Sequence, residues 1–290
     1  MYPAQTSWPS NASSTMERDV VRDIQSRFDS PAWCHWPGAQ VAVKRVPGIG
    51  FGGDFHHVLH EPNDRFSIVV GTVRARGLSA AFAKALLSGE VTRWAATALS
   101  TGGLWDCLSH SLDRINADLM GNVRCAVFHG QVDRIRRQFE YRTVGRIWPV
   151  AVTTRREPFS LSIESGALDG TNAAAPRIRR IPLNGLIRLV ICTEGFLEAR
   201  SPEGNELRSV ITPNMFVPTA GLDPEEQADA FIRKLREHVG DDHVCTDDAT
   251  VFIVDFSESG SRRDTESDES WLRAKAEAIE HAPDSSIFIG

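Results

Sequence analysis

Four short segments decide how this chain folds: residues 52–55 (GGDF), 71–77 (GTVRARG), 193–196 (TEGF) and 247–250 (DDAT). Three of them set an acidic residue beside glycine or an apolar strand, and residues 71–77 join the end of an apolar strand to a glycine. Carboxylates at strand ends, next to glycines that let the backbone approach closely, suit hard cations such as Mg²⁺ and Mn²⁺. Any one segment alone also fits an ordinary turn before a strand. Their order along the chain therefore carries the interpretation.

The residues around these segments predict a mixture of strands and helices. Leucine and isoleucine recur at helical spacing through residues 103–120, which predicts a helix with one buried face. Asp223 is placed to cap a further helix, with Pro224 at its first position. Helices are expected at 17–28, 78–91, 103–120 and 223–239, and strands at 40–46, 66–72, 125–132, 138–144, 148–153, 187–193 and 250–256. Successive helices followed by successive strands favour sheets covered by helices over a doubly wound parallel sheet.

Composition narrows the class of protein. The chain has 290 residues, 41% hydrophobic residues and a formal net charge of -6, which is poor for sequence-independent nucleic-acid binding. Its five cysteines form no CxxC pair, which argues against a disulfide framework and favours the cytoplasm. No signal peptide and no membrane span are expected. We expect a disordered tail at 1–16, one domain at 17–256 and an acidic flexible tail at 257–290.

In their order, the four segments resemble the PPM-type serine/threonine protein phosphatase family, in its SpoIIE/RsbU-like bacterial branch. Family members read GGDFYD, then GDVSGHG or GDVSGKG, then TDG, then DDAT or DDIT. This chain reads GGDFHH, GTVRARG, TEGFLEA and DDATVFIV. Asn116 and the stretch 141–150 (YRTVGRIWPV) also fall where the family has characteristic residues. The resemblance implies an α/β (α+β) fold, an α-β-β-α sandwich of two mostly antiparallel sheets flanked by helices.

The resemblance also implies a metal site, and two of its positions are changed here. Metal ligands are implied at five positions: Asp54, Thr72, Val73, Glu194 and Asp247. In the family, the glycine next to the aspartate at position 72 contributes its main-chain carbonyl. Catalytic roles are implied for Asp54, Glu194 and Asp247. Thr72 stands where the family has the aspartate that bridges both ions, and a neutral hydroxyl cannot bridge two divalent cations. Glu194 replaces an aspartate and reaches one methylene further.

Arg74 and Arg76 stand in the loop beside this site. One interpretation is that an arginine replaces the missing cation and neutralises Asp54 and Asp247, because guanidinium pairs well with carboxylates. A second is that an arginine binds phosphate as a bidentate donor. A third is that both point to solvent.

Three nearby histidines, His56, His57 and His60, are interpreted as surface residues rather than as a zinc site. Adjacent residues of a strand face opposite sides, so His56 and His57 cannot share one ion. The tryptophans are expected to pack in the core and at its rim, in preference to forming a platform for nucleic-acid bases.

Two functions remain open from the sequence. The first is a metal-dependent hydrolase using Mn²⁺ or Mg²⁺, with at most one ion well held, acting on a phosphoprotein such as an anti-sigma-factor antagonist. The second is a catalytically inactive pseudophosphatase that serves as a protein-binding regulatory module. Thr72 is the residue that discriminates between them, and it favours impaired catalysis.

Overall fold

The computed structural model describes residues 31–256, apart from 32, 37, 50–51, 62, 76–77, 98–100, 120–121, 172–174, 218–222 and 241–244, and adds Val20 and Asp23. The tails expected at 1–16 and 257–290 lie outside the described residues. So does the helix expected at 17–28, except for Val20 and Asp23.

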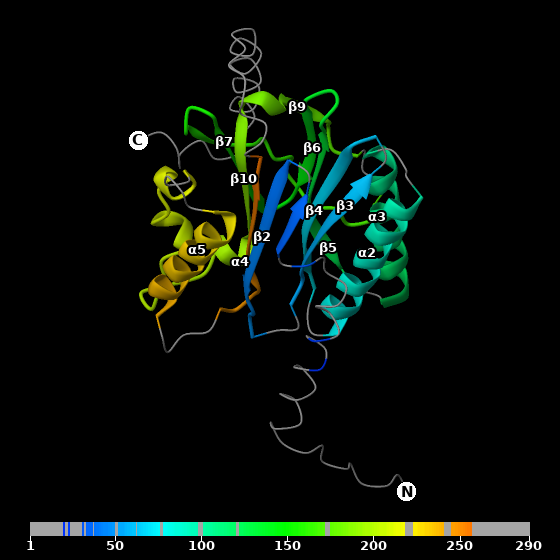
Figure 1. Ribbon diagram of the computed structural model, residues 1–290. Coiled ribbons are helices and arrows are strands. Elements are labelled where there is room, and N and C mark those ends of the chain that lie inside the picture. The colour runs from blue at the N-terminus through cyan, green and yellow to red at the C-terminus, as the bar shows by residue number, and fades with distance from the viewer. Residues whose placement is uncertain are drawn as a thin grey trace, which may run out of the picture.

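Two antiparallel sheets form the centre of the molecule (Figure 1). The first sheet, in spatial order, contains β1 (Trp33–Trp36), β2 (Ala39–Val46), β11 (Ala249–Asp255), β10 (Leu186–Thr193), β7 (Ile147–Thr153) and β8 (Pro158–Ser160). The second contains β3 (Asp54–Glu61), β4 (Arg65–Arg74), β5 (Arg124–Asp133), β6 (Gln138–Val144) and β9 (Arg179–Pro182). The predicted hairpin of residues 125–132 and 138–144 is confirmed as the β5–β6 pair.

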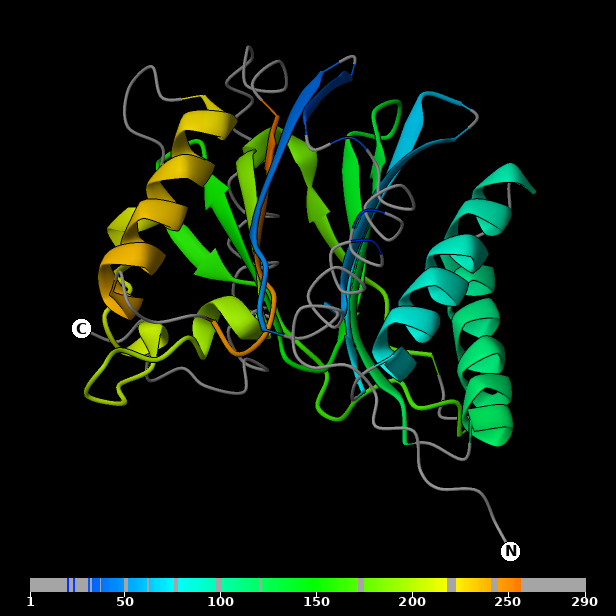
Figure 2. The same cartoon turned by 90° about the horizontal axis from the view of Figure 1, so that it is seen from below.

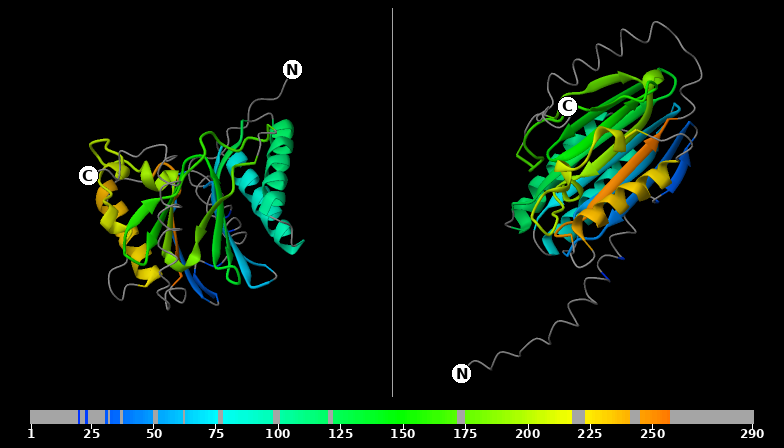
Figure 3. Two further views of the ribbon diagram at one scale, coloured as in Figure 1. Left: turned by 90° about the horizontal axis from the view of Figure 1, so that it is seen from above. Right: turned by 90° about the vertical axis from the view of Figure 1, so that its left-hand side faces the viewer.

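Helices cover the outer face of each sheet, as Figures 2 and 3 show. Helices α2 (Leu78–Ala96) and α3 (Thr101–Leu119) lie over the second sheet, while α4 (Glu194–Leu197) and α5 (Pro224–Val239) lie over the first. Short 3₁₀ turns occur at η1 (Leu183–Gly185), η2 (Leu207–Ser209) and η3 (Pro213–Met215). The predicted α-β-β-α sandwich is confirmed.

Alternation along the strands builds three apolar layers. In β11, Phe252 and Val254 face the space between the sheets, whereas Val251 and Ile253 face α5. Successive strand residues point to opposite faces, so a strand buried on both faces reads as a continuous apolar run. This explains why β10 and β11 were readable from the sequence.

Helix α5 begins as its sequence predicts. The Asp223 carboxylate accepts a hydrogen bond from the Glu226 N–H at 2.7 Å, and the Glu226 side chain accepts one from the Asp223 N–H, which completes a capping box. A buried polar chain then ties α5 to the sheet. Arg188 of β10 donates to Gln227 at 2.5 Å and to the carboxylate of Asp255.

Several elements were not predicted. Strands β1, β8 and β9, helix α4 and the full length of β3 have no clear periodicity in the sequence. In β3 the polar residues His56, His57 and Glu61 are buried, so both faces of the strand read as polar. None of the helices in the described part of the chain has the length and apolarity that a bilayer span requires.

Candidate functional site

The four quoted segments meet at one end of the sandwich. Asp54, at the start of β3, lies directly opposite Thr72 of β4 in the antiparallel register. Glu194 begins α4 immediately after β10, and Asp247 precedes β11, which pairs with β10. A Cβ on Gly195, the residue after Glu194, would lie 3.2 Å from the Asp247 Cβ, so the start of α4 packs against the segment before β11. The segments that carry Asp54, Thr72, Glu194 and Asp247 thus meet at one end of the two sheets.

Asp54 joins the two sheets through threonine hydroxyls. Its Oδ2 accepts hydrogen bonds from Thr193 Oγ1 at 2.8 Å and from Thr250 Oγ1 at 2.6 Å. The Thr250 N–H in turn donates to Thr193 Oγ1 at 3.0 Å. Asp54 is 1% exposed, and both threonines are as deeply buried. These two hydroxyls were missed by the sequence reasoning, although both stand inside quoted segments.

Burial makes the Asp54 carboxyl a weak acid. Its pKa is raised from 3.8 to about 7, first because the charged form is removed from water and second because the charge of Asp248 lies close by. Arg45 and the hydroxyls of Thr250 and Thr72 act in the opposite direction. Near neutral pH the protonated and charged forms of Asp54 are therefore both populated.

The two glycines before Asp54 allow the segments to touch. A Cβ on Gly53 would lie under 3.0 Å from the carbonyl oxygen of Val73, a separation that real Cβ atoms essentially never show. The Val73 N–H donates to the Gly53 carbonyl at 2.9 Å. Gly52 has φ +67 and lies against the Asp248 carboxylate. Val73, one of the implied ligand positions, thus lies against the GGDF turn.

The two adjacent acids before β11 have different environments. Asp248 is 4% exposed, and its Oδ1 accepts the Gly48 N–H at 3.0 Å. Asp247 is more open, and its Oδ1 accepts the Asp248 N–H at 2.8 Å. Partial burial raises the pKa of Asp247, while the charge of Arg74 lowers it. Asp248, which is not among the implied ligands, is the more buried of the two.

Glu194 is held by two guanidinium groups. Its Oε1 lies 3.1 Å from Arg74 Nη2 and 3.0 Å from Arg146 Nη1, and its side chain is 8% exposed. Burial raises its pKa, and the charges of Arg74 and Arg146 oppose that rise. Of the carboxylates at the site, Arg74 makes its ion pair with Glu194, and its charge also acts on Asp247, one of the two carboxylates that the arginine interpretation named. Arg74 is the last residue of β4.

The other arginine named from the sequence, Arg76, lies outside the described residues. Arg146 was missed because it is far from Glu194 in the sequence. The register of β7 against β10, in which Ile147 lies opposite Thr193, brings it there. The signal that could have found Arg146 is its place within the 141–150 stretch.

The residues present do not fit a two-metal centre. A bridging position needs a carboxylate, and Thr72 is neutral. One oxygen of Asp54 is taken by two hydroxyls, and Glu194 is already paired with two cations. Among the described residues, no group of three or more His, Cys, Asp or Glu is placed to hold a metal ion. Asp54 Oδ1 has no hydrogen-bond partner among the described residues, and Glu194 Oε1 is held by ion pairs with two arginines.

The interpretation of the histidines as surface residues is wrong for two of them. His56 and His57 are 5% and 3% exposed, whereas His60 is exposed. They do face opposite sides of β3: His56 packs near Phe252 between the sheets, and His57 lies near Phe55 under the helices. Neighbouring strands supply the cover that a lone strand pattern does not reveal.

Two further sequence interpretations concern packing. Asn116 ties the end of α3 to β5: its side chain donates to the Val123 carbonyl at 3.1 Å and the Asp169 carbonyl at 2.8 Å, and accepts the Val123 N–H at 2.7 Å. Trp94, Trp105 and Trp148 are buried, as expected for packing residues. Neither group takes part directly in the site.

Comparison with known proteins agrees with this geometry. The family model described as Stage II sporulation protein E (SpoIIE) matches residues 62–257. No curated protein matches the sequence. The SiaA-PP2C domain of Pseudomonas aeruginosa has a TM-score of 0.66 at 20% identity, over 84% of this chain and 98% of that one.

Two other solved structures share the fold. The RsbU and RsbW domains of a Mycobacterium tuberculosis protein give a TM-score of 0.61 at 21% identity, over 75% of this chain and 61% of that one. RsbX in complex with magnesium gives 0.55 at 14% identity, over 77% of this chain and 98% of that one. At these identities, the structures establish the fold alone.

Proposed function

The chain belongs to the SpoIIE family of PPM-type phosphatase domains, and we propose that it binds a phosphorylated signalling protein but hydrolyses phosphoserine or phosphothreonine far more slowly than a member with an intact metal site. The partner class is a phosphoprotein such as an anti-sigma-factor antagonist, and the setting is the cytoplasm. This proposal combines the partner role of the family with the chemistry of this chain's own site.

The observation that carries the proposal is the position of Thr72. It lies opposite Asp54 in the β3–β4 register, where the resemblance implies a bridging carboxylate. Two divalent ions about 4 Å apart need negative ligands between them, because their mutual repulsion is otherwise uncompensated. A threonine hydroxyl supplies no charge.

The charges around Thr72 support the same conclusion. Arg74 and Arg146 put two positive groups on Glu194, which the resemblance implies as a metal ligand. A metal ion that binds Glu194 must displace both guanidinium groups or overcome their repulsion. We therefore propose weak binding of Mn²⁺ or Mg²⁺, with at most one ion well held, and minor roles for Asp54, Glu194 and Asp247 in hydrolysis.

A working metal-dependent phosphatase is the second candidate. It is favoured by the retention of Asp54 and Asp247 unchanged and by the carboxylate of Glu194. The bound metal would polarise the phosphoryl group and supply the attacking water. The two candidates predict different responses to the same substitutions.

The test is a set of variants assayed with manganese. We would measure Mn²⁺ binding by calorimetry and hydrolysis of p-nitrophenyl phosphate for the parent, Thr72→Asp and Thr72→Asp/Glu194→Asp. Thr92→Asp, which adds a carboxylate on the exposed face of α2, is the matched charge control. Loss of a single transition-state donor costs about 3 kcal/mol, so Thr72→Asp should raise turnover by roughly 100-fold.

Turnover of the double variant should rise further, because the shorter aspartate side chain at position 194 no longer reaches the guanidinium groups of Arg74 and Arg146. Strong manganese-dependent turnover in the parent, abolished by Asp247→Ala, would establish the working phosphatase instead. Two tightly bound ions in the parent would also contradict the proposal. No gain in the double variant would show that these two positions are not what limits the site.

A further inference from the structure

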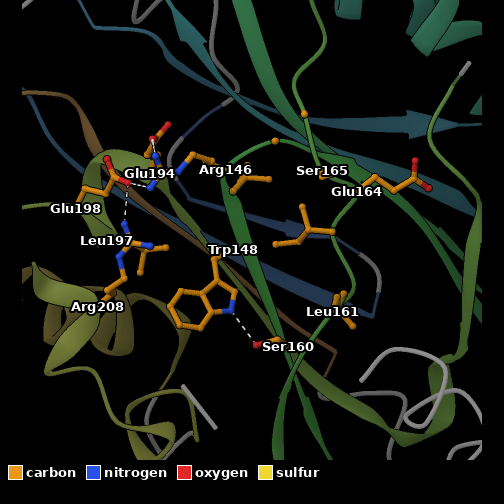
Figure 4. Close-up of a pocket in the computed structure, with 14 residues that line it drawn as sticks. Arg146, Trp148, Ser160, Leu161, Glu164, Ser165, Glu194, Leu197, Glu198 and Arg208 are labelled. Atoms are coloured by element: carbon orange, nitrogen blue, oxygen red, sulfur yellow. Dashed lines mark hydrogen bonds and ion pairs between the residues drawn. The ribbon is translucent and has the colours of Figure 1, made fainter. Parts of the chain in front are cut away.

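A pocket of about 370 Å³ is lined in part by Glu194, and Figure 4 shows the side chains around it. Its walls come from the start of β7, from residues 160–166 after β8, from α4 and from η2. Its volume lies within the range of pockets that bind small ligands or single side chains. Of the implied metal ligands, only Glu194 lines this pocket.

The floor of the pocket is apolar. Ile147, Trp148, Leu161 and Leu197 line it, and each is 8% exposed or less. The Trp148 Nε1–H donates to Ser160 Oγ at 2.8 Å, so the polar atom of the indole is already satisfied. What the floor offers a ligand is therefore hydrocarbon and an aromatic ring.

Both arginines on the wall are paired with carboxylates, and the further carboxylate of Glu164 accepts the Arg177 N–H at 2.6 Å. Arg146 contacts both Glu194 and Glu198, and Arg208 donates to Glu198 at 2.8 Å. The Arg208 Nε lies 2.7 Å from Glu206. Because each guanidinium is committed to carboxylates, the wall carries no surplus positive charge for a phosphate group. An acidic ligand would meet carboxylates there, while both arginines of the described lining are already engaged.

The pocket shares one residue with the candidate site. Glu194 lines the pocket and is also the carboxylate that Arg74 contacts. A phosphorylated residue at the carboxylate site would therefore have its chain neighbours over the pocket. An extended chain advances about 3.3 Å per residue, so a side chain about three residues away is still within reach.

We propose that this pocket receives a bulky apolar side chain of the partner protein, close in sequence to its phosphorylated serine or threonine. The inference rests on the proposed function, since it requires a phosphoprotein partner, and it adds the sequence preference of that partner. The occupant is a side chain with no charge, because the floor is hydrocarbon and both arginines of the wall are already paired with carboxylates.

The test uses short peptides as the probe. Fluorescein-labelled heptapeptides carry a central phosphoserine and otherwise glycine, with one leucine moved through each remaining position, and binding is followed by anisotropy with Mn²⁺ and, separately, in EDTA. Unphosphorylated peptides are the matched controls. Leucine at one or two positions should lower Kd by about tenfold relative to the all-glycine phosphopeptide, the effect of burying one aliphatic side chain less its ordering cost.

Two variants fill or polarise the pocket. Ser165→Trp adds a large side chain at its exposed edge, and Ile163→Asp puts a carboxylate on its wall. Both should abolish the leucine preference and leave binding of the all-glycine phosphopeptide unchanged. Thr92→Trp, on the exposed face of α2, should retain the preference. Thermal melting identifies folded variants, and Ile163→Asp decides the question if Ser165→Trp does not fold.

The possible outcomes separate this inference from the proposed function. Phosphopeptide binding by the parent without a leucine preference overturns the inference and leaves the proposed function standing. A preference that survives in both folded variants also overturns it. Loss of all-glycine phosphopeptide binding in both variants would assign the pocket to the phosphate instead. If the folded parent binds no phosphopeptide, the inference and the proposed partner class both fail.

Discussion

Replacing Asp54 by asparagine removes a buried carboxyl whose pKa is raised from 3.8 to about 7 by burial and by the charge of Asp248. Between these two values, the folded protein binds one more proton at this residue than the unfolded chain does. The free energy of unfolding therefore falls as pH rises through this window, by about 1.4 kcal/mol per pH unit. Between pH 5 and pH 8 this amounts to about 3 kcal/mol.

Asparagine does not titrate, and its amide oxygen can still accept the hydroxyls of Thr193 and Thr250. The free energy of unfolding of Asp54→Asn, relative to that of the parent, should therefore rise by about 3 kcal/mol from pH 5 to pH 8. At pH 8 the variant should be the more stable of the two. The assay is urea unfolding in EDTA at several pH values. Asp118→Asn, an exposed substitution on α3, should run parallel to the parent. A constant difference between Asp54→Asn and the parent would refute the reasoning, because Asp54 would then titrate alike in both states.

Two further predictions concern stability. Asp255→Ala leaves the buried Arg188 guanidinium without its carboxylate and should lower the free energy of unfolding by about 3–5 kcal/mol, measured in urea, whereas Arg188→Met/Asp255→Leu should recover most of the loss. Gly53→Ala forces a Cβ against the Val73 carbonyl and should cost at least about 2 kcal/mol by the same measurement. A loss below 0.5 kcal/mol, which is typical of surface substitutions, would show that the GGDF turn relaxes freely.

The sequence predicted best those elements whose signal is local. Helix α5 is one example, because its N-terminus is specified within one turn by Asp223, Pro224 and Glu226. Strand β11 is another, since both of its faces are apolar. The four segments of the site were found because their order along the chain can be recognised in the sequence itself, and because their residue types already suggested ion binding.

The sequence could not reveal what depends on pairing between distant elements. Strand β3 looked polar because the partners of its buried groups are elsewhere: the Glu61 carboxylate accepts Gln131 Nε2–H at 2.5 Å and also the Ser67 hydroxyl. The contact of Arg146 with Glu194 follows from the β7–β10 register, which no local pattern encodes. The pocket is likewise made by four separate elements.

The substitutions at the site are consistent with one another when their charges are considered together. Without a cation, several carboxylates gathered in a partly buried site repel one another, and an unpaired buried charge costs several kcal/mol. Thr72 removes one such charge. Asp54 is relieved by two hydroxyls and by its raised pKa, and Glu194 by Arg74 and Arg146. Restoring aspartate at position 72 therefore reintroduces repulsion that only a bound cation can relieve, so the gain in metal affinity and the loss of stability without metal should appear in the same variant.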